Sequence, residues 1–213
     1  MNQNLTLFLL YAHTISGHIA LLAGLFSLIS KKGQRLHKKS GFIFFIGMLT
    51  VGISGVILSI AKSNLFLFHI AIFVGYQAFA GFRALKNKSL KAQWYDYLNT
   101  TIALVNGIFM VMSLQVILMV FGGIGLLLSI GELQTSFRIY AGQTLPKNVW
   151  LRKHIGMMIG AYIGASTAFL VVNFVLDSVP AFLIWLAPTV IFMPIMIYWQ
   201  RKINTQNNLH DLN

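Results

Sequence analysis

The stretch 41–61, GFIFFIGMLTVGISGVILSIA, has no charged side chain over 21 positions, and it follows directly on the basic stretch 37–40, HKKS. A helix needs about 20 mostly apolar residues to cross roughly 30 Å of hydrocarbon. The stretch therefore predicts a transmembrane helix that begins at a positively charged membrane surface.

The rest of the chain has a similar composition. Of its 213 residues 57% are apolar and 9% are charged, and only Asp96, Glu132, Asp177 and Asp211 are acidic. A soluble domain carries about a quarter charged residues, so this chain is predicted to be solvated by lipid. The composition excludes a soluble enzyme, a disordered tail and a secreted disulfide scaffold. The lack of cysteine also excludes thiolate metal sites and iron–sulfur clusters.

Seven apolar segments reach or approach the length of a membrane span. They are predicted at 5–30, 41–61, 65–85, 98–120, 122–140, 154–176 and 181–200. The boundary at 121–125 is the least defined of these. The chain shows no internal repeat and no linker, so we predict one all-α transmembrane domain over 1–213, a polytopic bundle of seven helices.

The basic residues set the predicted topology. Fifteen of the sixteen Lys and Arg fall in loops on one side of the seven spans, Lys62 being the exception. Positive residues stay in the cytoplasm, which places the N-terminus outside and the C-terminus inside a cytoplasmic (inner) membrane. The same loops are predicted to contact anionic lipid headgroups. The net charge of +12 is spread over these short loops and forms no basic face, so no nucleic-acid partner is predicted.

A row of glycines marks the sixth segment. Gly156, Gly160 and Gly164 follow GxxxGxxxG spacing and share one helix face. Small residues at this spacing let helix backbones approach closely, so the row predicts tight packing on another helix, either of this chain or of a partner.

Five histidines lie within the spans or at their ends. Counted at about 1.5 Å per residue, they sort by depth into an outer pair, an inner pair and a central residue. The outer pair is His13 with His69, the inner pair is His37 with His154, and His18 is central. Two imidazoles from facing helices at one depth form a bis-histidine haem site. The four paired histidines are therefore candidate ligands of b-type haem, for electron transfer or haem handling.

Glu132 is the only carboxylate deep within a predicted span, and an unpaired charge there costs at least a few kcal/mol. It is predicted to pair with His18, directly or through water, as a brace or a proton relay. The alternative is a neutral acid that hydrogen bonds to Ser129 or Ser136.

Two other classes of function stay open. A metal-dependent membrane hydrolase would use histidines together with Glu132, although no HExxH or HxxxH spacing occurs and no metal ligand is assigned. A non-catalytic role in transport, or as a partner subunit, would use the Gly156 row. Whether the chain is an enzyme stays undecided.

Three short motifs resemble a family of bacterial multipass membrane proteins of unknown function. They are His13-Thr-Ile-Ser-Gly17 with Ala20-Leu-Leu and Gly24, then His37-Lys-Lys-Ser-Gly41, and then His154-Ile-Gly-Met157 after Arg152 and Lys153. The resemblance covers the first, second and sixth spans, and the other four match in hydrophobicity only. It implies a multipass fold and a shared role for three histidines, but no reaction. The layout is also similar to that of transmembrane cytochromes b, a weaker analogy.

Overall fold

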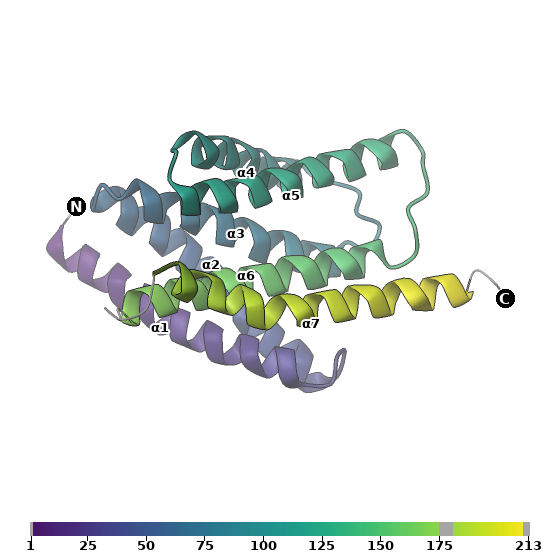
Figure 1. Ribbon diagram of the computed structural model, residues 1–213, viewed down its shortest axis with the longest axis horizontal. Coiled ribbons are helices and arrows are strands. Elements are labelled where there is room, and N and C mark those ends of the chain that lie inside the picture. Colours follow the sequence, from purple (N-terminus) through teal and green to yellow (C-terminus); the bar gives the residue numbers. More distant parts are fainter. Residues whose placement is uncertain (1, 175–180, 211–213) are drawn as a thin grey trace.

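The computed structural model describes residues 2–174 and 181–210, and all of its regular structure over these residues is helical (Figure 1). The helices are α1 (Gln3–Ile29), α2 (Arg35–Ala61), α3 (Leu65–Lys86), α4 (Trp94–Met112), α5 (Val116–Tyr140), α6 (Val149–Asn173) and α7 (Ala181–His210). The all-α prediction is confirmed.

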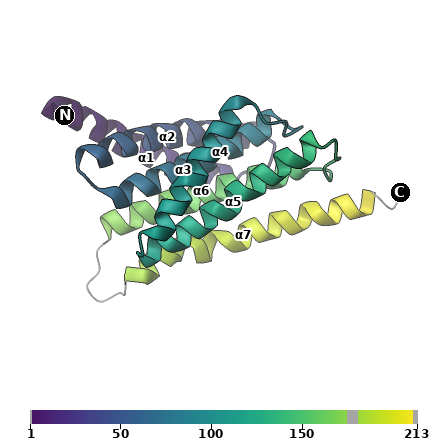
Figure 2. The ribbon, with the colours of Figure 1, turned by 90° about the horizontal axis from the view of Figure 1, so that it is seen from above.

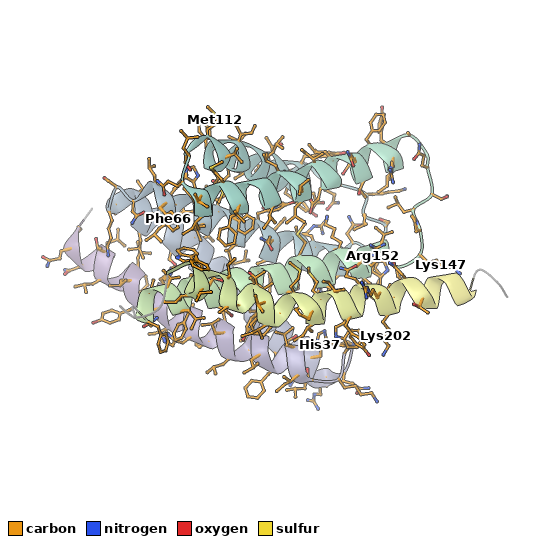
Figure 3. All side chains as sticks on the ribbon, viewed as in Figure 1. His37, Phe66, Met112, Lys147, Arg152 and Lys202 are labelled. Carbon is orange, nitrogen blue, oxygen red and sulfur yellow. The ribbon has the colours of Figure 1, made fainter. Side chains whose placement is uncertain are left out.

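The helices run roughly along the long axis of the bundle, and the two termini lie at its opposite ends (Figure 1). His37, Lys147, Arg152 and Lys202 lie at one end, which we call the basic end, and Phe66 and Met112 lie at the other (Figure 3). The gathering of basic loops at one end is as the sequence predicts. Which end faces the cytoplasm stays a prediction.

Six of the described helices, namely α1, α2, α3, α5, α6 and α7, are long and apolar enough to cross a membrane. Large apolar side chains such as Phe8, Ile53 and Leu127 are exposed on their outer faces. A soluble protein rarely exposes so much contiguous apolar surface. The bundle is compatible with a multipass membrane protein. The α4 helix differs, because its 19 residues include Asp96, Asn99 and Asn106.

The largest error of the prediction lies between α4 and α5. The chain breaks at 113–115, where Leu114 takes a left-handed φ of 57°, and not at 121–125. Gly122 lies inside α5, where a Cβ would come 2.7 Å from the Met110 Cβ. Gly122 thus lets α5 pack closely on α4.

Several other helices extend beyond the predicted spans. The α2 helix begins at Arg35 and α6 at Val149, each about five residues before the predicted span, and α7 continues to His210. Basic residues at the membrane surface thus belong to the helices themselves. The predicted end of the sixth span, 175–176, lies outside the described residues.

The α3 helix is the centre of the bundle, because it packs against α2, α4, α5 and α6. Seen from above, α1 and α2 lie along one edge and α7 along the other (Figure 2). The α5 helix packs on α3 and α4, whereas α6 packs on α3 and α7. This division leaves a space between α5 and the α6–α7 pair, with α3 behind it, and the candidate site occupies this space.

Candidate functional site

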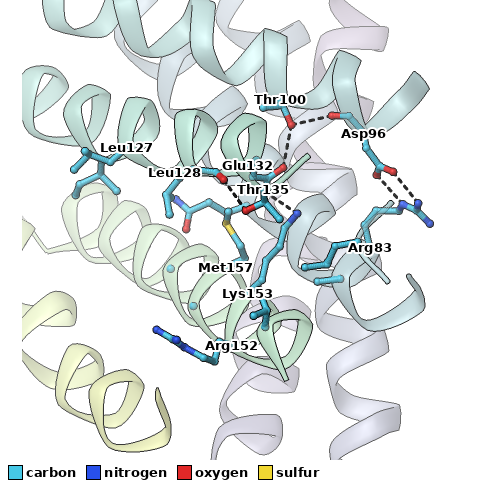
Figure 4. Close-up of a pocket in the computed structure, with 18 of the residues that line it drawn as sticks. Arg83, Asp96, Thr100, Leu127, Leu128, Glu132, Thr135, Arg152, Lys153 and Met157 are labelled. Carbon is cyan, nitrogen blue, oxygen red and sulfur yellow. Dashed lines mark hydrogen bonds and ion pairs between the residues drawn. The ribbon is translucent and has the colours of Figure 1, made fainter. Parts of the chain in front are cut away.

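A cavity of about 650 Å³ lies between α5 on one side and α6 and α7 on the other (Figure 4). Its inner part is lined by apolar side chains, among them Phe73, Phe121, Ile124, Ile163 and Met193. Charged side chains line the part nearest the basic end. The cavity is therefore amphipathic along its length.

Glu132 on α5 forms the charged centre of this cavity. Its Oε1 lies 3.0 Å from the Lys153 ammonium of α6, and its Oε2 lies 2.9 Å from the Thr100 hydroxyl of α4. Lys153 contacts Oε1 as an ion pair without the alignment of a hydrogen bond, so Oε1 keeps an unused lone pair. The Tyr76 hydroxyl, also buried without a hydrogen bond, is close enough to interact with this carboxylate. Glu132 thus links α4, α5 and α6, with Tyr76 of α3 beside it.

Arg83 and Asp96 form a second ion pair at the basic end. Arg83 Nε and Nη2 each donate to one oxygen of the Asp96 carboxylate at 2.8 Å. The backbone N–H of Gln93 donates to the same carboxylate at 3.0 Å, which caps α4. Partial burial alone would raise the pKa of Asp96, but the bonds and charge of Arg83 and the Gln93 amide outweigh it. The net effect lowers this pKa below its ordinary value. The pair fixes α3 to the start of α4.

Arg152 is a further cation on the cavity wall. Its Nε donates to Gln200 Oε1 of α7 at 3.0 Å, and Gln200 Nε2 donates back to the Arg152 carbonyl at 2.8 Å. Both described ion pairs involve other residues. Arg152 therefore presents a positive charge that no described carboxylate compensates.

Gln77 lies on the α3 wall of the cavity and is 2% exposed. Its Oε1 rests against α6, where a Cβ on Gly160 would come only 2.0 Å from it. Within the described ranges its side-chain amide has no hydrogen-bond partner. A buried amide without a partner costs free energy unless a ligand or water satisfies it.

The inner histidines both lie near the basic end, and each donates to a backbone carbonyl. His37 Nδ1 donates to the Ser27 carbonyl of α1 at 3.0 Å, and His154 Nδ1 donates to the Gly81 carbonyl of α3 at 2.9 Å. The two imidazoles are close enough to interact electrostatically. Lys32, between α1 and α2, lies near His37, and burial lowers the pKa of its ammonium.

The outer histidines face different helices. His13 Nδ1 lies 3.0 Å from Ser54 Oγ of α2, and the ring packs near Gly55 beside Ala71 of α3. His69 Nδ1 lies 2.7 Å from Asn106 Oδ1 of α4. Residue 71 is about 200° around α3 from His69. The two rings therefore lie on different sides of α3.

The partners of the histidines also define their tautomers. Ser54 donates its only proton to the Thr50 carbonyl, so its oxygen accepts from His13 Nδ1. Asn106 Nδ2 donates to the His69 carbonyl, which turns Oδ1 toward the His69 ring as an acceptor. In all four predicted ligands Nδ1 thus carries the proton, and Nε2 is the ring nitrogen with a free lone pair.

The predicted direct contact between His18 and Glu132 is wrong. His18 Nδ1 donates to the Thr14 carbonyl of its own helix at 2.7 Å, and its ring contacts Phe169 of α6. Glu132 takes Lys153 instead, because α5 packs on α3 and α4 and not on α1. The alternative partner Ser129 donates to the Gly125 and Leu126 carbonyls of α5.

The Gly156 row packs inside the chain. A Cβ at Gly164 would lie 2.7 Å from Val74 of α3, and one at Gly156 would lie 3.4 Å from Gln200 of α7. The row therefore lets α6 approach α3 and α7 closely, as predicted for helix packing. A partner protein on this row stays a prediction.

Several site residues escaped the sequence reasoning. Lys153 and Arg152 count among the loop charges that set the predicted topology, and Gln77 carries no signal of a site in the sequence. Asp96 was given no role. Among the described residues no three His, Cys, Asp or Glu side chains cluster as metal ligands would.

Comparison with known proteins gives no relative from which function could be transferred: no family model matches the chain, and no curated protein or solved structure matches it. The resemblance to a bacterial membrane protein family therefore stays a prediction.

Proposed function

We propose that this chain is a multipass membrane protein that binds b-type haem through His37 of α2 and His154 of α6 and uses it in electron transfer or haem handling. The observation that carries the proposal is that both imidazoles lie within electrostatic range of each other near the basic end, each with Nδ1 fixed by a backbone carbonyl. Neutral imidazoles held in this way are typical axial ligands.

The orientation of both rings supports the proposal. A histidine that binds a metal usually donates its other ring N–H to a carbonyl or carboxylate, which sets the tautomer and raises ligand basicity. Here the Ser27 and Gly81 carbonyls accept these protons at 3.0 and 2.9 Å. Nε2 of each ring is therefore the nitrogen available to iron.

The charges around the pair also suit haem, which carries negatively charged propionates. Lys32 and Lys38 are both close enough to His37 to act on it electrostatically. The Lys32 ammonium donates to the Ser27 carbonyl at 3.0 Å, so it is held beside the same backbone group as the His37 ring. Cations at this position would neutralise propionates at the membrane surface.

We propose one haem, at the inner pair, whereas the sequence predicts two. His13 and His69 lie on different sides of α3 and bond to α2 and α4, so no common position between them supports a second haem. A zinc hydrolase needs three or four ligands, and the described residues offer no such cluster. Two histidines suffice for haem, and this favours the haem proposal over the hydrolase.

The test is the absorption spectrum of the purified protein from haem-supplied cells, with haem, iron and zinc measured per chain. We expect a Soret band that His37→Ala and His154→Ala each abolish. His69→Ala is the matched control, because it also removes a hydrogen-bonded histidine from a central helix, and it should keep the band. Melting temperatures check that the variants fold. A parent protein without haem, or a variant lacking both inner histidines that keeps full haem content, would contradict the proposal, and stoichiometric zinc would support the hydrolase.

A further inference from the structure

Three features of the cavity between α5 and the α6–α7 pair indicate the chemistry of a ligand. They are the net positive charge of its wall, its volume, and the amide of Gln77, which has no described hydrogen-bond partner. We infer that it binds a single-chain lipid with one negative charge, a monoacyl phospholipid such as lysophosphatidylglycerol. Its phosphodiester would lie at Arg152 and Lys153, and its acyl chain would lie along the apolar part of the cavity. The inference is independent of the haem proposal, which concerns other residues.

The charges of the cavity wall call for a monoanion. Arg83, Arg152 and Lys153 face two carboxylates, Asp96 and Glu132, so the wall carries one more positive than negative charge. Arg83 is bound to Asp96 and Lys153 to Glu132. Arg152 keeps only the Gln200 side chain as partner for its Nε. Its remaining guanidinium N–H groups can bind two oxygens of one phosphate.

The size of the cavity favours one chain over two. At about 30 Å³ for each water-sized group, its 650 Å³ hold roughly 20 non-hydrogen atoms. This volume holds the phosphate and glycerol of a monoacyl lipid with the first part of its chain, and it is too little for a headgroup with two chains. Leu127 lines the cavity yet is 75% exposed, so the cavity opens sideways between α5 and α7, where the end of the chain can continue into the bilayer.

Gln77 accounts for the ester group of such a lipid. Its Oε1 rests against Gly160, which is seven residues, or about 10 Å, along α6 from Lys153. The Gln77 side chain therefore lies deeper in the cavity than the charged groups. The residue is 2% exposed, and its amide N–H groups have no described partner. In a monoacyl phospholipid the three glycerol carbons separate the phosphate from the ester, so the ester carbonyl would lie deeper than the phosphate and would accept from this amide.

Gly131 gives a clean way to fill the cavity. It lines the cavity on α5, and a Cβ at this position would meet no atom within 4 Å. Gly123 has equally open space on the same helix but does not line the cavity. Gly131→Leu and Gly123→Leu are therefore a matched pair, with the same substitution in the same helix.

The experiment is native mass spectrometry of the purified full chain, titrated with palmitoyl lysophosphatidylglycerol. We expect one bound copy, weakened about tenfold or more by Arg152→Gln and by Gly131→Leu, and unchanged by Gly123→Leu. Zwitterionic lysophosphatidylcholine should bind at least about tenfold more weakly, as should glycerol phosphate, which lacks the chain. Equal binding of the two lysolipids, or a Gly131→Leu protein that binds like the parent, would overturn the inference. Tighter binding of two-chain phosphatidylglycerol would overturn the single-chain assignment.

A second measurement isolates the role of Gln77 and does not depend on Gly131→Leu folding. Gln77→Leu should weaken the ester lipid several-fold but leave unchanged the binding of the ether analogue, which has no carbonyl. A merely structural role of Gln77 would weaken both lipids equally, and that result would contradict the assignment of the amide to the ester.

Discussion

The ion pair between Lys153 and Glu132 joins α6 to α5 across the cavity, and its removal should have a measurable cost. Nζ and Oε1 are 3.0 Å apart, and the side chains are 24% and 11% exposed. Removing one partner of a fully buried pair costs about 3–5 kcal/mol, because the other charge is left uncompensated. This pair is only partly buried, so water screens the charge that is left on Glu132. We therefore expect Lys153→Met to lower the free energy of unfolding by about 2 kcal/mol.

The double variant Lys153→Met with Glu132→Gln should recover most of this loss. A neutral glutamine leaves no charge unpaired and keeps a polar group next to Thr100. The Thr100 hydroxyl lies 2.9 Å from both Glu132 Oε2 and the Asp96 carbonyl oxygen, but it has one proton for the two acceptors. A glutamine N–H can donate to this hydroxyl, so both contacts are satisfied. Glu132→Leu offers no such bond and should be less stable than Glu132→Gln.

The assay is thermal unfolding of the detergent-purified protein, followed by tryptophan fluorescence. A chain of this size loses roughly 2–4 °C in melting temperature for each kcal/mol, so Lys153→Met should melt about 4–8 °C lower. Lys91→Met, at an exposed position of the α3–α4 loop, is the control. The reasoning fails if Lys153→Met costs no more than this control, or if the effects of the two single variants simply add in the double variant.

Three further predictions concern topology, packing and pH. A tag at the N-terminus should be accessible only from outside the cell and one at the C-terminus only from the cytoplasm, and labelling of both from one side would refute the seven crossings. Gly164→Ala should melt at a lower temperature than Gly123→Ala. A Cβ at Gly164 would lie 2.7 Å from Val74 Cγ2, whereas a Cβ at Gly123 would meet no atom within 4 Å. Equal melting temperatures of the two variants would speak against tight packing of α6 on α3 at Gly164. The stability that Asp96 gains from Arg83 should be complete above about pH 4 and lost as the pH falls through its lowered pKa. Melting temperatures between pH 6 and 3 should show this loss in the parent and not in Asp96→Asn.

Much of the fold can be predicted from the positions of the charged residues in the sequence. The long uncharged runs and the basic loops predict the helices and the gathering of positive charge at one end, because lipid excludes charge wherever the helix is not shielded. The break between α4 and α5 does not follow in this way. Leu114 takes the left-handed conformation there without being glycine, asparagine or aspartate, which are the residues that usually signal it.

The charged centre of the cavity was missed for a related reason. Lys153 precedes the predicted sixth span, and there it reads as a surface charge that sets topology. In the structure α6 begins at Val149, so Lys153 is already helical and projects toward α5. A long lysine side chain can reach inward from a helix end. Glu132 was correctly singled out as needing a partner, but sequence cannot tell which helix lies beside it.

The histidines show the same limit in its simplest form. Depth along a helix follows from counting residues, and by that count both the outer and the inner pair share a level. Which way each ring faces depends on the neighbouring helices. Here the inner pair lies within electrostatic range, with His154 held by the Gly81 carbonyl of α3, whereas the outer pair lies on different sides of α3. His69 turns instead to Asn106, a polar residue of α4. The polar residues of α4 thus serve the interior of the bundle: Asn106 binds His69, Thr100 binds Glu132 and Asp96 binds Arg83. This explains why a helix with so many polar groups can lie among lipid-exposed ones, since each of these groups is used by a side chain of α3 or α5.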